Sequence, residues 1–133
     1  MPQIHTPQAS PCVATVIDFF YFLDMRQHAD AAALMAEQGT WTRGEELLRG
    51  PGEVLSALEQ RPLNRTTCHV VTNLRVAHLS ECSATIRFYM SAYVGVAGEE
   101  EMRLVSLRRC TDELVLADGA WKIGKKTSAQ MLP

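Results

Sequence analysis

The chain has 133 residues, of which 47% are hydrophobic and 21% charged, so it has the size and composition of one folded domain rather than a disordered polypeptide. Its net charge of −2 gives no electrostatic signature of nucleic-acid or membrane-surface binding. The longest apolar run, FFYFL at 19–23, is far too short for a membrane span, and residues 1–11 lack the features of a signal peptide. We therefore expect a cytoplasmic protein without nucleic-acid or membrane partners.

The first predicted element is a helix over residues 12–23. Its apolar face includes Val16 and Phe20, and the next position on that face is Asp24. A carboxylate there would be partly desolvated, which would raise its pKa and suit it to acid–base chemistry. Alternatively the helix ends at Leu23 and Asp24 faces solvent in a turn. The helical pattern alone leaves both interpretations open.

Residues up to about 61 are typical of helix and residues from about 66 onward of strand. Asp30 starts a second predicted helix that Gly39 stops, residues 41–50 form a short extended excursion around Gly44, and Pro51 starts a third helix that Pro62 ends. Four strand-like runs follow, at 66–79, 83–95, 102–117 and 120–129. Asp118-Gly119 between the last two is a strong hairpin signal. Helices followed by an antiparallel meander predict an α+β fold, with the helices on one face of a curved sheet.

Three stretches together resemble the SnoaL-like branch of the nuclear-transport-factor-two-like superfamily. They are Leu23-Asp24 followed by His28-Ala-Asp30-Ala, then Arg49-Gly50-Pro-Gly-Glu-Val with Thr67-Cys-His69-Val-Val-Thr-Asn73, and finally Thr111-Asp112-Glu-Leu with Asp118-Gly-Ala-Trp121-Lys-Ile123. The resemblance implies a cone-shaped half-barrel, in which three helices close one end of a strongly bent, mainly antiparallel sheet around an apolar pocket. It covers a single domain at 12–128, between an expected flexible arm at 1–11 and a tail at 129–133. Members include scytalone dehydratase, ketosteroid isomerase, polyketide cyclases and non-catalytic dioxygenase small subunits.

The same resemblance implies that Asp24 and His69 reach the pocket as a catalytic acid–base pair. Histidine exchanges protons near neutral pH, with the acid orienting it. Strand alternation opposes this assignment, because Cys68 and Val70 belong to the more apolar face and His69 to the other. A bulge would reconcile the two, and an interface or core histidine is the alternative.

For several other candidate residues, the sequence allows both a functional role and a purely structural one. Tyr21 either supplies a phenolic donor or packs in the core, and Trp41 either stacks on substrate or packs. Phe20, Leu58 and Tyr89 are the remaining expected pocket residues. Arg43 is either solvated or meets an anionic substrate group. Outside the pocket, Asp112 is expected to start the last hairpin or to pair with an arginine. The outer sheet face is expected to carry Arg87, Arg103, Arg108 and Arg109. The remaining histidines, His5, His28 and His78, are expected at the surface.

The resemblance therefore favours a cofactor-free acid–base dehydratase, isomerase or cyclase that acts on a small hydrophobic, ring-containing molecule. A later-strand pocket histidine, which the dehydratase pattern expects, is missing. The alternative is a non-catalytic ligand-binding or oligomerisation module, such as a dioxygenase small subunit. No metal site is expected, because no CxxC pair occurs and Cys68-His69 has poor ligand spacing. A homodimer through the outer sheet face is expected in either case.

Overall fold

The computed structural model describes residues 9–131, so residues 1–8 of the expected N-terminal arm and residues 132–133 of the expected tail lie outside the described residues. The elements are α1 (Ala9–Asp24), α2 (His28–Ala33), β1 (Met35–Arg43), β2 (Glu46–Arg49), α3 (Gly50–Glu59), β3 (Arg65–Leu79), β4 (Ser83–Val96), β5 (Arg103–Ala117) and β6 (Ala120–Gln130). The first helix therefore begins before residue 12 and the last strand continues beyond residue 128. The limits 12–128 of the domain stay a prediction.

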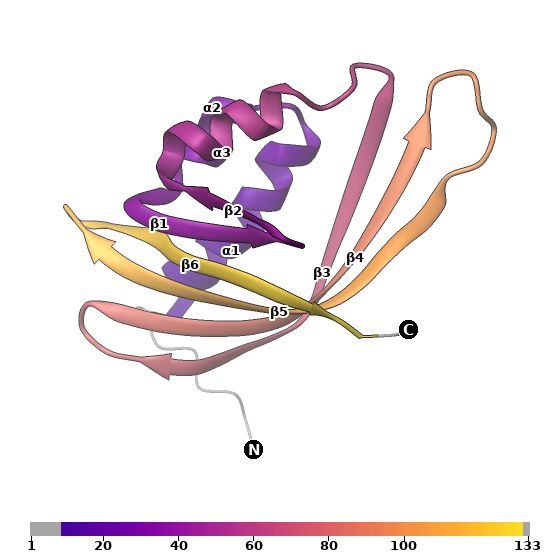
Figure 1. Cartoon of the computed structure of the whole chain (residues 1–133). Coiled ribbons are helices and arrows are strands. Elements are labelled where there is room, and N and C mark those ends of the chain that lie inside the picture. Colours follow the sequence, from indigo (N-terminus) through magenta and orange to yellow (C-terminus); the bar gives the residue numbers. More distant parts are fainter. Residues whose placement is uncertain (1–8, 132–133) are drawn as a thin grey trace.

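The sheet has six strands in the order β2-β1-β6-β5-β4-β3, and it is the frame that positions the site. Only the β1–β6 pair is parallel within the described chain, and the other neighbours are antiparallel. The sheet bends strongly and does not close, and the helices lie together over its concave side (Figure 1). The predicted α+β cone is confirmed.

The second helix is shorter than predicted, and β1 occupies part of its expected range. α2 ends at Ala33, and the chain becomes a strand at Met35. The backbone amide of Ile123 donates to the carbonyl of Leu34 at 2.8 Å, which ties the end of the helix to β6. Gly39 permits the backbone of β6 to lie close to β1, because a Cβ at this position would lie 2.4 Å from the carbonyl oxygen of Ile123. The helix-stop interpretation of Gly39 was wrong: the residue serves strand packing, and tertiary pairing overrides the helical pattern.

A bulge in β3 decides which side chains face the concave side. Thr67, His69 and Val71 are partly buried there, whereas Val70 is 40% exposed. Asn73 has a left-handed φ of 55° at a break in the register with β4, after which Leu74 packs against the core. One extra residue exchanges the two faces of a strand. The expectation that Cys68 and Val70 form the inner face was wrong, and the bulge reverses it.

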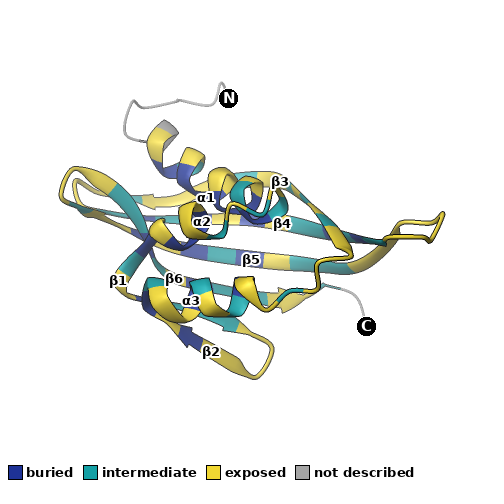
Figure 2. Cartoon of the chain, turned by 90° about the horizontal axis from the view of Figure 1, so that it is seen from above, coloured by how far each residue is buried: buried dark blue, intermediate teal, exposed yellow. Residues whose placement is uncertain are grey.

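The hydrophobic core lies between α1 and the middle of the sheet. Phe19 and Phe20 of α1 meet Ile86 and Phe88 of β4, all nearly inaccessible to solvent. Seen from above, buried residues lie beneath the helices, while the β4–β5 hairpin tip projects beyond them and is exposed (Figure 2). No helix in the described residues is long and apolar enough to cross a membrane.

The outer face of the sheet carries only part of the expected arginine set. Arg87 and Arg109 are exposed and line a surface depression with Tyr89. Arg108 does not share that face, because its Nε donates to the Oγ of Ser128, a residue that lines the concave side, at 2.6 Å. Neighbouring strand residues point to opposite faces, so Arg108 and Arg109 diverge. Dimerisation through the outer face stays a prediction.

Candidate active site

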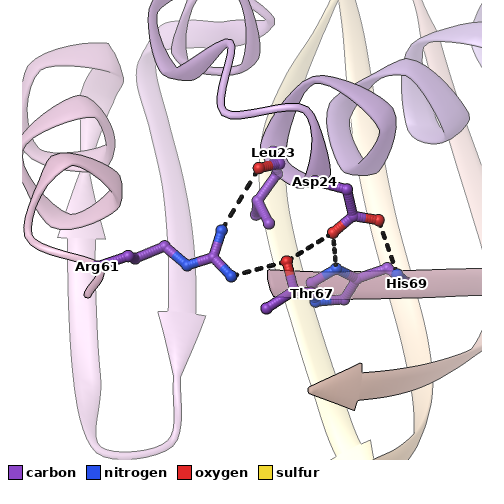
Figure 3. Close-up of polar contacts among 5 residues, drawn as sticks. All are labelled: Leu23, Asp24, Arg61, Thr67 and His69. Carbon is purple, nitrogen blue, oxygen red and sulfur yellow. Dashed lines mark hydrogen bonds and ion pairs between the residues drawn. The ribbon is translucent and has the colours of Figure 1, made fainter. Parts of the chain in front are cut away.

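Asp24 and His69 form a hydrogen-bonded pair where the end of α1 meets β3 (Figure 3). The Nδ1 of His69 lies 2.6 Å from the Oδ1 of Asp24, and the backbone amide of His69 donates to Oδ2 at 2.7 Å. The hydroxyl of Thr67 donates to Oδ1 at 2.9 Å. Three groups of β3 therefore fix the carboxylate, and both side chains are mostly buried, with 17% of Asp24 and 13% of His69 exposed. Asp24 therefore faces β3 rather than solvent, although it does not itself line the cavity.

The electrostatics of Asp24 differ from the expectation. Burial raises the pKa of its carboxyl, but the hydrogen bonds and charge of His69 and the hydroxyl of Thr67 outweigh burial, so that the pKa is lowered overall. The expected rise was wrong, because the sequence pattern showed the burial and not the donors. Asp24 therefore stays ionised and orients His69 rather than donating a proton itself.

The Asp24 contact also fixes the tautomer of His69. A carboxylate accepts the proton of Nδ1, which leaves the Nε2 of the neutral ring as a basic lone pair. No described group hydrogen-bonds Nε2, and His69 lines the cavity beneath the helices. The ring of Phe20 stacks on the imidazole, with centroids 5.1 Å apart. The contacts with Asp24 and Phe20 therefore fix the orientation of the His69 ring.

The cavity beside His69 has a volume of about 220 Å³. Its floor is apolar and buried, with Phe20, Leu23 and Leu58 each at most 4% exposed. Exposed side chains, among them Arg43 and Arg65, mark its mouth. The cavity therefore has an apolar floor and a positively charged mouth.

A second ion pair, Asp112–Lys126, lies in the wall of the same cavity. The Nζ of Lys126 is 2.9 and 3.2 Å from the two carboxylate oxygens of Asp112, whose exposure is 0%. This ammonium also lies over three phenyl rings, at 4.6 Å from Phe19, 4.4 Å from Phe20 and 5.5 Å from Phe88. Burial raises the pKa of Asp112, and the neighbouring ammonium opposes that rise. Asp112 neither starts the hairpin nor pairs with an arginine, so that expectation was wrong.

Several predicted pocket residues lie in the cavity wall, and three, Asp24, Tyr21 and Tyr89, do not. Phe20, Trp41 and Leu58 line it. Tyr21 is 56% exposed and packs against Phe22 outside the cavity, and Tyr89 is 37% exposed on the outer sheet face. Tyr21 lies on the solvent-facing side of α1 together with Ile17, which is 42% exposed, although residues three apart, such as Tyr21 and Asp24, are close together around a helix. The phenolic donor is therefore missing from the site.

Burial shifts the pKa of two further groups near the site, Cys110 and His28, toward the uncharged form. Burial raises the pKa of the Cys110 thiol to about 11, so this cavity residue stays protonated and is a poor nucleophile. His28 is not the surface residue that was expected: its Nε2 is buried and has no hydrogen-bond partner, and burial followed by the charges of Arg26 and Arg61 lowers its pKa. The described residues contain no cluster of histidine, cysteine and carboxylate side chains that could hold a metal ion.

A sequence model of the SnoaL-like domain matches residues 12–127, nearly the whole chain. The chain belongs to the SnoaL-like domain family. No curated protein matches the chain by sequence.

Three solved structures illustrate the fold that this chain shares. One, named for scytalone dehydratase and from Novosphingobium aromaticivorans DSM 12444, is 21% identical with a TM-score of 0.82 and coverage of 93% of this chain and 84% of that one. ActVI-ORFA from Streptomyces coelicolor is 17% identical, with a TM-score of 0.80 and coverage of 95% and 98%. A type 2 hexachlorocyclohexane dehydrochlorinase, LinA, is 20% identical, with a TM-score of 0.80 and coverage of 93% and 85%. Identities this low show the shared fold alone.

Proposed function

We propose that this SnoaL-like protein is a cofactor-free acid–base enzyme, a lyase or isomerase acting on a hydrophobic, ring-containing carbonyl compound. The observation that carries the proposal is the Asp24–His69 pair, in which Nδ1 lies 2.6 Å from the carboxylate while His69 lines the cavity. Two of the similar structures, the dehydrochlorinase and the one named for a dehydratase, bear names that describe eliminations. These names support an elimination without identifying the substrate.

The proposed step begins with proton transfer from carbon to His69. Nε2 takes a proton from the carbon beside the carbonyl, the C–H electron pair forms the enolate, and the imidazolium is stabilised by the Asp24 carboxylate. In an elimination the enolate expels a hydroxyl group from the next carbon, and that group leaves as water with the proton of Nε2. In an isomerisation the same proton returns to another carbon.

The ammonium of Lys126 suits the negative charge that develops on the enolate oxygen. It lines the cavity and lies 4.4 Å from the centroid of the Phe20 ring, the same ring that stacks on His69. A charge held in place by Asp112 needs no reorganisation during the reaction, which is the condition for effective electrostatic stabilisation. His69 and Lys126 therefore both line the cavity and both contact Phe20 in its apolar floor.

Hydrogen exchange at carbon tests the proposal without knowledge of the natural substrate. 2-Tetralone, a bicyclic ketone with acidic C–H bonds, is incubated with the protein in D₂O and deuterium incorporation is followed by NMR. The wild type is expected to accelerate exchange above the buffer rate, and Asp24→Asn to lower that acceleration by about 100-fold. The reason is that an asparagine amide can donate to Nδ1 and so favour the wrong tautomer.

Asp18→Asn is the matched control, because Asp18 is an exposed aspartate on the same helix. It is expected to exchange 2-tetralone at the wild-type rate. Equal rates for wild type and Asp24→Asn would remove Asp24 from the mechanism. No acceleration by the wild type with 2-tetralone, 1-tetralone or 2-indanone would favour the non-catalytic ligand-binding module instead.

A further inference from the structure

Positive charge gathers around the cavity, although the chain as a whole has a net charge of −2. The permanently charged residues in the cavity wall are Arg43, Arg61, Arg65 and Lys126, against the single carboxylate of Asp112. Lys126 is neutralised by Asp112, which leaves the three arginines. A cavity with this imbalance favours an anionic ligand.

None of these arginines is engaged in an ion pair within the described residues, where the close contacts between a basic and an acidic side chain are Asp24–His69 and Asp112–Lys126. Arg61 donates to neutral oxygens, the hydroxyl of Thr67 at 2.8 Å and the carbonyl of Leu23 at 3.4 Å. The guanidinium of Arg43 lies 5.0 Å from the ring centroid of Trp41. Glu46 is the one acid that shares the adjoining surface depression with the three arginines.

A further arginine adds to this positive field from outside the cavity. Arg26 donates to the backbone carbonyls of Pro62 and Arg65, which holds in place the loop that presents Arg65. Burial, and then the charges of Arg26, Arg65 and Arg43, lower the pKa of Arg61, while Asp24 opposes that change. The arginines therefore repel one another across the mouth, an arrangement that an anionic ligand would relieve.

The spacing between the mouth and the base limits the size of the ligand. Arg61 is bonded to Thr67, and Thr67 lies two residues before His69 on one face of β3 (Figure 3). Two residues of strand span about 7 Å. A carboxylate at the arginines would thus place a one- or two-ring skeleton over the apolar floor, with a ring carbon near Nε2.

We infer that the ligand of this cavity is a ring-containing carboxylic acid, whose carboxylate binds Arg43, Arg61 and Arg65 at the mouth while its ring occupies the floor beside His69. The inference deepens the proposed function and rests on it for the role of His69. Guanidinium groups bind carboxylates through paired, charge-assisted hydrogen bonds, which a lysine cannot reproduce. The class of substrate is accordingly a hydrophobic, ring-containing carbonyl compound that also carries a carboxylate.

Two probes of nearly equal shape test the anion preference. Binding of 2-naphthoate and of 2-naphthamide, its neutral analogue, is measured by calorimetry. The wild type is expected to bind the carboxylate about 10-fold more tightly or better, as charge-assisted hydrogen bonds provide, and the preference is expected to weaken at high salt. Arg65→Gln and Arg43→Gln should each reduce the preference several-fold. Both side chains are exposed, so the variants should fold.

Arg87→Gln is the matched control, since it removes the same charge from the outer sheet face. It should leave the preference unchanged. Equal affinities of wild type for the two probes, no binding of either, or a preference that survives in both mouth variants would each overturn the inference. A protein that prefers the carboxylate but exchanges no tetralone deuterium would keep the anion site and lose the proposed enzyme function. A protein that exchanges tetralone deuterium but does not prefer the carboxylate would keep the proposed enzyme function and lose the anion site.

Discussion

Replacing His69 with glutamine is expected to lower the acceleration of deuterium exchange into 2-tetralone by about 10²–10⁴-fold, the usual contribution of a positioned general base. Glutamine has a similar reach but no basic nitrogen. Its backbone amide at position 69 and the hydroxyl of Thr67 still donate to Asp24, so the junction of α1 and β3 should persist. The loss should therefore concern proton transfer and not folding.

The control for this variant lies on the same strand. His78 is exposed on β3, and His78→Gln makes the same chemical change away from the cavity. The two variants should have the same thermal midpoint within a few degrees, and only His69→Gln should lose exchange. Retention of the wild-type exchange rate by a folded His69→Gln protein would show that another group is the base.

The second large effect is expected for Lys126→Met, which should lower the free energy of unfolding by about 3–5 kcal/mol. The substitution leaves Asp112 fully buried without its cation. Removing the ammonium raises the pKa of Asp112 further, beyond the rise that burial already causes. When the pKa of Asp112 is higher in the folded than in the unfolded protein, protonation of Asp112 favours the folded state at low pH. This contribution to the free energy of unfolding is lost as the pH rises through the folded-state pKa. The deficit of Lys126→Met should therefore be larger at pH 7 than at pH 4.

Urea denaturation at the two pH values measures this deficit, with Lys125→Met as the control because Lys125 is the exposed neighbour on β6. The double variant Asp112→Val with Lys126→Met should recover most of the loss, since a buried ion pair can often be replaced by apolar residues. A Lys126→Met protein within 1 kcal/mol of wild type, about the scale of an exposed pair, would contradict this description of the pair. So would a double variant no more stable than the single one.

The helices and the four long strands could be predicted because their local signals agree with the fold. Asp118 and Gly119 both have positive φ, 52° and 79°, as the two-residue Asp-Gly hairpin turn requires. The strand β1 could not be predicted in this way, since its start at Met35 depends on pairing with β6, far along the chain. Tertiary contacts decided that segment.

The Asp24–His69 pair could be predicted from the sequence, whereas the Asp112–Lys126 pair could not. Asp24 interrupts an apolar helix face, and that pattern together with the resemblance identified it. The contact of Asp112 with Lys126 depends on a bulge in β6: counting back from the turn pairs Asp112 with Lys125, but the register shifts after Ile123, and Gly124 is the extra residue. The bulge at Asn73 likewise turns His69 inward. Bulges of one residue leave little trace in the sequence pattern.

The protonation state of the two nitrogens of His69 tests the central claim most directly. In protein labelled with ¹⁵N at histidine, the neutral ring of His69 is expected to carry its proton on Nδ1, with Nε2 showing the chemical shift of an unprotonated nitrogen. Asp24→Asn should change this distribution, because the carboxylate that accepts the Nδ1 proton at 2.6 Å is lost. A neutral His69 with its proton on Nε2 in the wild type would contradict the account, since no base would then face the cavity.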